Sequence, residues 1–159
     1  MRAAVITISD GVAAGVREDE SGRLLVDLLE SEGYDVAHRV VPDDRPQIAA
    51  AIRELAQSTR LVLTTGGTGM SPRDFTPEAT ESVIERAAPG IAEALRADAI
   101  RQTPHGLLGR GVAGVRGKTL IVNLPGSPGG CRDGFHILQP ALGHALELLA
   151  GKQSEHRAT

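Results

Sequence analysis

Short, almost continuous apolar runs alternate along the chain with segments in which apolar residues recur every three or four positions. The continuous runs are typical of strands buried on both faces of a parallel sheet. Runs of this kind occupy residues 3–9, 34–41, 61–65 and 119–124. We therefore predict four buried strands, the first of them close to the first residue.

Leucine and isoleucine at helical spacing predict helices between these strands. Four leucines between residues 24 and 29 mark the first helix, and Gly33 follows as a C-cap residue would. Ile48, Ile52 and Leu55 share one face of the second helix. Further helices are expected from Thr76-Pro77 to Pro89-Gly90, from residue 91 to about residue 101, and after Gly130, the last interrupted or restarted at Pro140.

Two stretches carry weaker patterns. Residues 10–20 are polar and contain glycine, which predicts a loop. Residues 102–118 contain five glycines and one proline, and only a short strand near residues 112–115 is expected there. Strands that alternate with helices predict an α/β domain over residues 1–151, with a mainly parallel sheet covered on both faces. Residues 152–159 are expected to form a flexible tail.

Polar or glycine-containing loops directly follow the predicted strands. They are Ser9-Asp10, Pro42-Asp43-Asp44, residues 65–74 and residues 123–130. In an open parallel sheet, ligands bind beyond the carboxyl ends of the strands, near the point where the strand order reverses. We therefore expect these four loops to form one ligand site.

The loop after the third strand holds the densest polar chemistry. Its candidate binding residues are Thr65, Gly66, Gly67, Thr68, Gly69, Arg73 and Asp74. The glycines would let the backbone approach an anion, while the hydroxyls and the arginine fork would add donors. Because a carboxylate repels phosphate, Asp74 suggests that Mg²⁺ lies between them. The alternative is a strand-to-helix turn with ordinary capping.

The loop after the fourth strand combines glycine and serine with rigid prolines. Its candidate binding residues are Asn123, Leu124, Pro125, Gly126 and Ser127. Alone, such a loop is more often structural than functional, but its place at the same sheet edge favours binding. Asp43 precedes a helix, where an aspartate is usually the N-cap. Since Asp44 can cap that helix instead, Asp43 is free to face the cleft with Asp74.

Two nucleotide-binding motifs are excluded. A Walker A loop needs a lysine and then serine or threonine after its last glycine, and here Met70-Ser71 follows. Residues 109–114 match the letters G-x-G-x-x-G of the dinucleotide fingerprint. That fingerprint must open a helix, whereas this segment leads into another strand.

Composition excludes further classes of function. The net charge is −3 and aromatic residues make up 2%, so nucleic-acid binding is not expected. The single cysteine, Cys131, excludes an internal disulfide, and we predict a structural role for it. The five histidines show no metal-ligand spacing and are expected to be scattered. The N-terminal apolar run is too short for a signal peptide or a membrane span, so a cytoplasmic protein without membrane contact is expected.

The two glycine-containing loops together resemble the molybdopterin-binding family of molybdenum cofactor biosynthesis. Residues 64–80 contain T-T-G-G-T-G followed by R-D-F-T-P-E-A-T, and residues 123–128 read N-L-P-G-S-P. Ser9-Asp10 and residues 19–22 also match the family's first-loop pattern. Within the family, the chain is similar to the small stand-alone molybdopterin adenylyltransferases and their close relatives. The resemblance runs from about residue 3 to residue 151.

The resemblance implies a three-layer α/β domain, usually a homotrimer, that binds molybdopterin and, in active members, ATP with Mg²⁺. It places the family's two important aspartates at Asp43 and Asp74, as catalytic residues and metal ligands. The substrate-binding loops map onto residues 65–69 and 123–127, with Ser9 and Asp10 nearby. The expected reaction transfers AMP from ATP to molybdopterin and releases pyrophosphate. The molybdate-insertion enzyme is a candidate partner.

Two other functions fit the same pattern less well. A non-catalytic molybdopterin-binding or carrier protein would keep the glycine loops, but the presence of both Asp43 and Asp74 favours the enzyme. A nucleotide-amide hydrolase is suggested by relatives in which this domain is fused to others. We expect neither the second domain nor the catalytic dyad that this hydrolase would need.

Overall fold

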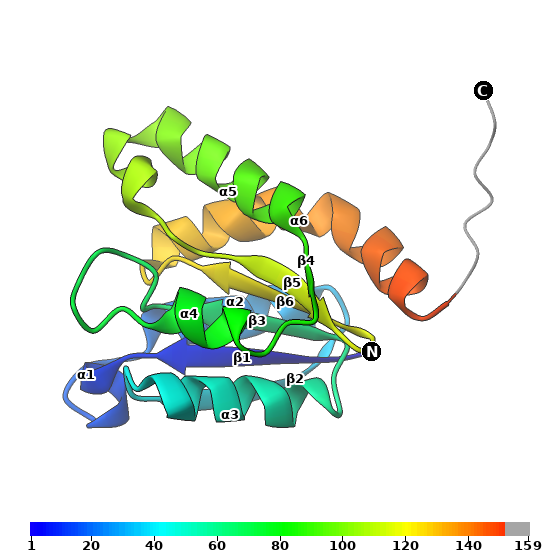
Figure 1. Ribbon diagram of the computed structural model, residues 1–159, viewed down its shortest axis with the longest axis horizontal. Helices are drawn as coiled ribbons and strands as arrows, with labels where there is room; N and C mark the ends of the chain where they lie inside the picture. Colours follow the sequence, from blue (N-terminus) through cyan, green and yellow to red (C-terminus); the bar gives the residue numbers. More distant parts are fainter. Residues whose placement is uncertain (152–159) are drawn as a thin grey trace.

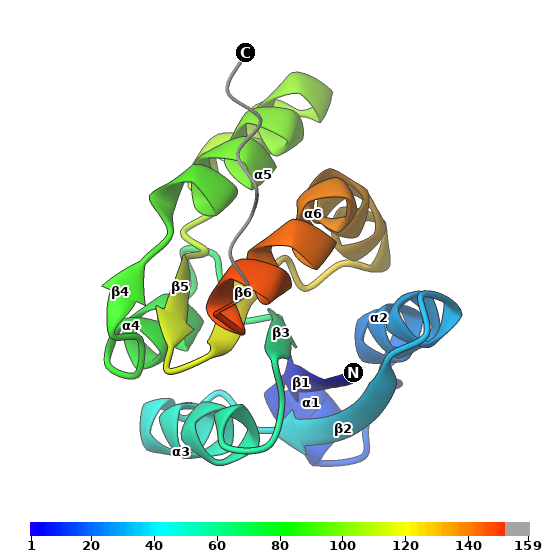
Figure 2. The ribbon, with the colours of Figure 1, turned by 90° about the vertical axis from the view of Figure 1, so that its right-hand side faces the viewer.

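A computed structural model describes residues 1–151, which form a six-stranded sheet with helices on both faces (Figures 1 and 2). The strands are β1 (Arg2–Ile8), β2 (Asp35–Val41), β3 (Leu61–Thr65), β4 (Arg86–Ala87), β5 (Ala113–Arg116) and β6 (Thr119–Leu124). The helices are α1 (Asp10–Ala13), α2 (Glu20–Ser31), α3 (Arg45–Ala56), α4 (Thr76–Glu81), α5 (Pro89–Gln102), the 3-10 helix η1 (Pro104–Leu108) and α6 (Pro128–Leu149). The tail predicted at residues 152–159 lies outside the described residues.

The strand order is β2-β1-β3-β6-β5-β4. β1 pairs in parallel with β2 and β3, and β3 pairs in parallel with β6. β5 is antiparallel to β6, and β4 is antiparallel to β5. The predicted α/β fold with a mainly parallel sheet is therefore confirmed, with antiparallel pairings added at one side. Because the chain continues from β1 to β2 on one side and then to β3 on the other, the strand order reverses between β1 and β3.

The register makes the four parallel strands end level with one another. Ile8 pairs with Val41, and Thr65 pairs with both Thr7 and Leu124. The loops that follow these strands therefore leave the sheet at one edge. In Figure 1 this edge lies at the left, where α1 and the loop before α4 project.

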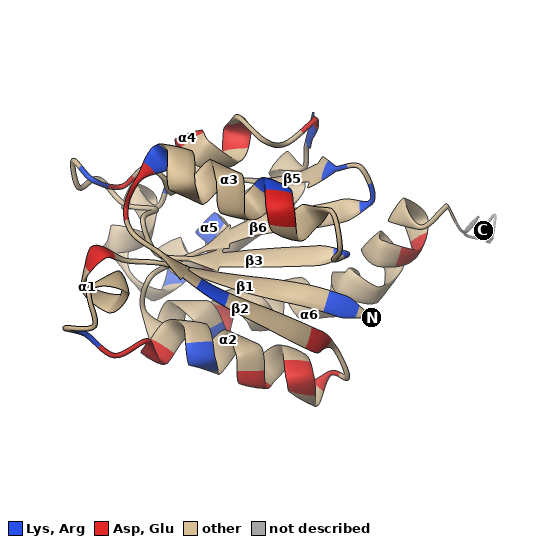
Figure 3. Ribbon diagram, turned by 90° about the horizontal axis from the view of Figure 1, so that it is seen from below, with Lys and Arg blue, Asp and Glu red and all other residues tan. Residues whose placement is uncertain are grey.

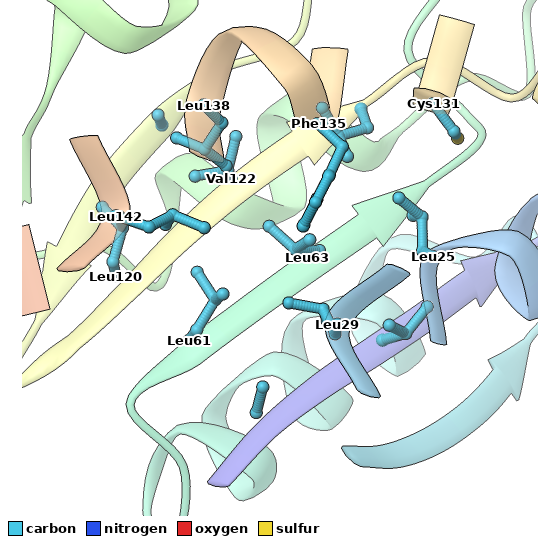
Figure 4. Close-up of a cluster of buried hydrophobic side chains, with 14 of the residues drawn as sticks. Leu25, Leu29, Leu61, Leu63, Leu120, Val122, Cys131, Phe135, Leu138 and Leu142 are labelled. Atoms are coloured by element: carbon cyan, nitrogen blue, oxygen red, sulfur yellow. The ribbon is translucent and has the colours of Figure 1, made fainter. Parts of the chain in front are cut away.

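Side chains along the central strands alternate between two hydrophobic cores. Leu61 and Leu63 of β3 belong to the core that contains Leu29 of α2 and Phe135 of α6, whereas Val62 belongs to the core against α3. Figure 4 shows the first of these cores between β3 and the two helices. Helices α2, α5 and α6 thus cover one face of the sheet, and α3 and α4 cover the other (Figure 2).

The helix predicted from residue 76 to Pro89 is wrong in its second half. α4 ends at Glu81. The Ser82 hydroxyl then donates to the carbonyl oxygen of Ala79 at 2.7 Å, a local bond that competes with helix continuation. The chain turns there to pair β4 with β5. Pro89 does not separate two helices but begins α5, where its missing N–H costs nothing.

Two further predictions need correction. The polar loop expected after β1 contains α1, whose N-cap residue Ser9 accepts a hydrogen bond from the backbone of Val12 at 3.3 Å. α6 is continuous through Pro140, because Leu138 and Leu142 on either side are buried in the core and offset the lost backbone bond.

α6 has 22 residues, yet no helix within the described chain has the apolar length of a membrane span.

Candidate functional site

A cavity of about 490 Å³ opens at the edge where the parallel strands end, and it is called the site cavity below. All four predicted loops contribute to its lining. Their lining residues are Ser9, Asp43, Thr65, Gly66, Gly67, Asp74, Gly126, Ser127 and Pro128. The lining residues that were not predicted are Thr7, Ile8, Val12, Arg17, Glu18, Asp19, Glu20 and Ser21. Residues 17–21, which lead into α2, are thus the main part of the cavity that pattern reasoning missed.

Gly66 and Gly67 bring their backbone unusually close to neighbouring elements. Their φ angles are +96° and +66°, in the left-handed region. A Cβ on Gly66 would lie 2.2 Å from the carbonyl oxygen of Ile8, and one on Gly67 would lie 2.3 Å from Oγ1 of Thr76. The loop therefore packs against the end of β1 at a distance that only glycine permits.

Thr76 closes the glycine loop at its base. It does not cap α4, because Phe75 occupies the N-cap position and makes no side-chain cap bond. The Thr76 hydroxyl donates instead to the carbonyl oxygen of Gly66 at 2.8 Å. The Thr76 backbone N–H donates to the carbonyl oxygen of Gly67 at 3.1 Å.

The second loop is anchored to the first through Thr65. The Thr65 hydroxyl donates to the carbonyl oxygen of Pro125 at 2.7 Å, and the Cys131 sulfur lies 3.0 Å from the same oxygen. A Cβ on Gly126 would lie 3.4 Å from the Cα of Gly66. Burial raises the pKa of the Cys131 thiol to about 11, so that the sulfur stays protonated near neutral pH. Cys131 thus helps to hold the two loops together, in agreement with its predicted structural role.

Two helices begin at the site cavity. Asp19 is the N-cap of α2 and accepts from the N–H of Gly22 at 2.9 Å. Ser127 is the N-cap of α6 and accepts from the N–H of Gly130 at 3.1 Å. The N–H groups of Glu20 and Ser21 in α2 and of Gly129 in α6 have no partner within their helices, whereas Pro128 has no N–H, and the helix dipole favours an anion there. Both helix ends therefore suit a phosphate group.

The charged side chains that line the site cavity are mainly acidic. They comprise one arginine, Arg17, and five carboxylates: Glu18, Asp19, Glu20, Asp43 and Asp74. Figure 3 shows acidic residues at α1 and at the start of α2, beside this edge of the sheet. A ligand with phosphate groups would be repelled by these carboxylates unless a cation lay between them.

Asp19 is already engaged by two side chains. The Thr7 hydroxyl donates to Oδ2 of Asp19 at 2.7 Å, and Nε2 of His38 lies 2.9 Å from the same oxygen. His38, expected to be a scattered histidine, is therefore a partner of a residue that lines the site cavity. The sequence gives no signal for this contact, because β2 meets the start of α2 only through the tertiary fold.

Asp43 faces the site cavity because Asp44 takes the capping position. Asp44 is the N-cap of α3, as predicted. The Asp43 carboxylate accepts from the backbone N–H of Asp10 at 2.8 Å, and the Asp10 carboxylate accepts from the backbone N–H of Asp43 at 3.0 Å. Burial raises the pKa of the Asp43 carboxyl, and the negative charges of Asp10 and Asp74 raise it further.

Asp43 and Asp74 could together hold a Mg²⁺ ion beside the phosphate oxygens of a ligand. Mg²⁺ takes oxygen ligands, usually keeps several waters, and binds through one or two carboxylates together with phosphates. Asp43 and Asp74 line the same cavity, and the negative charge of Asp74 raises the pKa of Asp43. A cation bound between the two carboxylates would offset this repulsion. Within residues 1–151, no group of three or more histidine, cysteine, aspartate or glutamate side chains could hold a metal ion. Phosphate and water oxygens would therefore complete the coordination.

Arg73 is not the free phosphate fork that the sequence suggests. Its Nε donates to Oδ2 of Asp10 at 2.7 Å, and one terminal nitrogen donates to Oδ1 of Asp10 at 3.2 Å and to the carbonyl oxygen of Asp43 at 3.0 Å. Hydrogen bonding to Arg73 lowers the pKa of the Asp10 carboxyl. Neither Arg73 nor Asp10 is among the residues that line the site cavity. This ion pair instead ties the glycine loop to α1.

Three other predicted residues face a second cavity. Thr68, Gly69 and Pro125 line a space of about 490 Å³ between the two loops, α5, η1 and α6. Ser127 lines both this cavity and the site cavity. The predicted binding loops thus border two adjacent spaces rather than one.

Asn123 and Leu124 lie within β6 and make structural contacts, while their binding role stays a prediction. The Asn123 amide donates to the hydroxyls of Thr64 at 3.0 Å and Thr80 at 2.9 Å. The Asn123 side-chain oxygen accepts from the backbone N–H of Val112 at 3.1 Å. Leu124 is fully buried in the core. Both side chains are thus engaged in contacts within the domain, and they also border a small space of about 60 Å³ beside Thr68 and Pro125.

Comparison with known proteins identifies the family. Residues 4–144 match the model of a probable molybdopterin binding domain. The chain belongs to this family. The chain is 35% identical over 152 residues to the molybdopterin adenylyltransferase of Helicobacter pylori. The match covers 92% of this chain and 86% of that protein. The crystal structure of the molybdopterin biosynthesis enzyme MoaB from Thermus thermophilus is similar with a TM-score of 0.88, at 45% identity, over 95% of this chain and 97% of that chain.

The same molybdopterin-binding domain also occurs within longer relatives. The chain is 36% identical over 160 residues to gephyrin of Dictyostelium discoideum. The match covers 93% of this chain but only 22% of gephyrin. The likeness to gephyrin therefore concerns this domain alone.

Proposed function

We propose that this protein is a molybdopterin adenylyltransferase, which transfers AMP from Mg²⁺-ATP to molybdopterin and releases pyrophosphate. The observation that carries the proposal is the site cavity, where Asp43 and Asp74 line one space together with the N-terminal ends of α2 and α6. Helix N-termini bind phosphate, and paired carboxylates suit the Mg²⁺ that accompanies ATP. The activity named for the Helicobacter pylori relative supports the same function.

The reaction needs no nucleophilic side chain from the protein. An oxygen of the terminal phosphate of molybdopterin forms a bond with the α-phosphorus of ATP. The bond between that phosphorus and the oxygen bridging to the β-phosphate breaks, and pyrophosphate leaves with the bond's electron pair. Binding, alignment and charge neutralisation therefore supply most of the catalysis.

The residues of the site cavity would align the two phosphate-bearing substrates. Gly66 and Gly67 let the loop pack against β1 while its backbone lines the site cavity, and the free N–H groups at the starts of α2 and α6 would hold phosphate oxygens. Asp43 and Asp74 would hold Mg²⁺ beside the phosphates of ATP. When bound, the metal ion supplies positive charge that offsets the charge on the departing pyrophosphate.

The two adjacent cavities support a reaction with two substrates. Each has a volume of about 490 Å³, which is within the usual range for small-molecule sites. Ser127, the N-cap residue of α6, lines both cavities. A nucleotide in one space and a pterin in the other would bring their phosphates together near Ser127.

The competing function is a non-catalytic molybdopterin-binding or carrier protein, which would use the same loops. A pyrophosphate-release assay separates the two functions. We expect release when protein, molybdopterin, ATP and Mg²⁺ are combined, and none when either substrate is omitted or EDTA is added. Tight molybdopterin binding without pyrophosphate release would favour the carrier.

We also propose a homotrimer, with the molybdate-insertion enzyme as a partner that receives the product. A surface hollow lined by Ile84, Pro89, Ala92 and Ile100, among others, offers apolar area to another subunit. Sedimentation at micromolar concentration should give three times the mass of one chain. A measured mass equal to that of one chain under these conditions would refute the proposed trimer.

A further inference from the structure

Arg110 lies outside the glycine loop but makes more bonds to that loop than its sequence position suggests. It belongs to residues 109–114, which resemble a dinucleotide fingerprint but lead into β5. The Arg110 backbone N–H donates to the carbonyl oxygen of Thr68 at 2.9 Å. Its guanidinium donates from Nε to the carbonyl oxygen of Gly69 at 2.7 Å, and from a terminal nitrogen to that of Asp74 at 2.8 Å. The remaining terminal nitrogen pairs with Glu78.

The segment that Arg110 contacts, residues 68–75, contains Asp74, which lines the site cavity. Within this segment, the Asp74 N–H donates to the carbonyl oxygen of Ser71 at 2.9 Å, and the Ser71 N–H donates to the Asp74 carboxylate at 3.0 Å. These bonds shape a turn, but they do not attach it to the rest of the domain. The Arg73–Asp10 pair attaches it on one side, and both of those side chains are about half exposed or more. Arg110, whose side chain is only 31% exposed, attaches it on the other side.

We propose that Arg110 is a positioning residue, which fixes residues 68–75 so that the Asp74 carboxylate faces Asp43 across the site cavity. This role rests on the proposed function, because Asp43 and Asp74 are the groups that would hold the metal ion. The planar guanidinium suits the role, since it presents several donors in a rigid fork and reaches Gly69, Asp74 and Glu78 at once. A lysine could offer its single ammonium group to only part of this set.

Glu78 complicates the simplest test. The oxygen of Glu78 that does not bind Arg110 is buried and has no hydrogen-bond partner among the described residues. Removing Arg110 alone would leave this carboxylate without its counter-charge, which destabilises a protein whatever the role of the arginine. The double variant Arg110→Gln/Glu78→Gln removes both charges together. Glu78→Gln alone breaks the ion pair but keeps the guanidinium bonds to the carbonyl oxygens of Gly69 and Asp74.

Kinetics on these variants should separate positioning from binding. We expect kcat of Arg110→Gln/Glu78→Gln to fall about 100-fold, the scale of a catalytic group displaced by about 1 Å, with KM for ATP little changed. Arg110→Lys should recover part of this loss, and Glu78→Gln should keep most of the activity. Arg116→Ala is the matched control, because Arg116 also binds a carbonyl oxygen, that of Val83 at 2.9 Å, and lies near a glutamate. We expect Arg116→Ala to turn over normally.

Hydrogen exchange of the ligand-free protein gives a readout that does not depend on turnover. Peptides covering residues 68–75 should exchange on the order of tenfold faster in the double variant, which is the effect of losing roughly one net hydrogen bond. Peptides from β3 and β6 should exchange as in the wild type. If the wild type fails to transfer AMP but exchange accelerates as described, the proposed function fails and the fixing of the segment by Arg110 stands. Unchanged exchange with normal kcat, or a rise in KM with kcat unchanged, would overturn the role of Arg110.

Discussion

Replacing Gly66 with alanine would test whether the glycine loop depends on close backbone contact. Gly66 has a φ of +96°, and the added methyl carbon would lie 2.2 Å from the carbonyl oxygen of Ile8. The left-handed conformation costs a non-glycine residue roughly 1–2 kcal/mol. The clash adds roughly 1–3 kcal/mol, because a strand backbone cannot rotate away as a side chain can. We therefore expect Gly66→Ala to lower the free energy of unfolding by roughly 2–5 kcal/mol.

Gly33→Ala is the matched control for this prediction. Gly33 has a similar φ of +85°, but an added Cβ would meet no heavy atom within 4 Å. Only the conformational cost of roughly 1–2 kcal/mol should therefore remain. Urea unfolding followed by circular dichroism would measure both variants, since the chain contains no tryptophan for fluorescence. Equal losses in the two variants, at equal protein concentration, would refute the reasoning, because the contact with Ile8 would then contribute nothing.

Three other substitutions or treatments test the site. Asp74→Asn should lower kcat by about 100-fold or more, the scale of one lost electrostatic group. Molybdopterin affinity should stay level or improve, because a negative charge is gone. A loss of affinity with normal kcat would instead show that Asp74 is a binding group. Burial and neighbouring charges raise the pKa of Asp43 in the folded state, so its ionisation destabilises the fold as pH rises above the ordinary aspartate range. Thermal unfolding without metal should therefore find Asp43→Asn at least as stable as the wild type at pH 7 and no different near pH 3, and a variant less stable at pH 7 would contradict this. Cys131 is buried with a pKa of about 11, so iodoacetamide at pH 8 should modify it only after unfolding, and rapid modification of the folded protein would contradict the burial.

The sequence predicted the elements whose causes are local. The four parallel strands are continuous apolar runs, and Gly33 ends α2 with the positive φ that glycine tolerates. β4 was missed because two exposed residues, Arg86 and Ala87, form a strand only by pairing with β5. The continuity of α6 through Pro140 was missed because burial of the flanking leucines decides it, and burial is set by the tertiary fold.

The site shows the same division between local and non-local causes. Topology alone brings the predicted loops to one edge, and the adjacent Asp44 explains why Asp43 faces the cavity. The pairing of Arg73 with Asp10 could not be predicted, because these residues are 63 positions apart and meet only when the loops fold together. The strand at residues 119–124 was predicted, but the bonds from the Asn123 amide to the hydroxyls of Thr64 and Thr80 were not, because these residues meet only in the tertiary fold.

The fate of the α-phosphate of ATP tests the proposed function most directly. Protein, molybdopterin and Mg²⁺ would be mixed with ATP labelled at the α-phosphorus for a single turnover. The products would then be separated and identified by mass spectrometry. We expect the label in an adduct of AMP with molybdopterin, formed in equal amount with unlabelled pyrophosphate and absent when EDTA is added. Label that stays in ATP, or that appears only as free AMP while molybdopterin is bound and unchanged, would contradict adenylyl transfer by this protein.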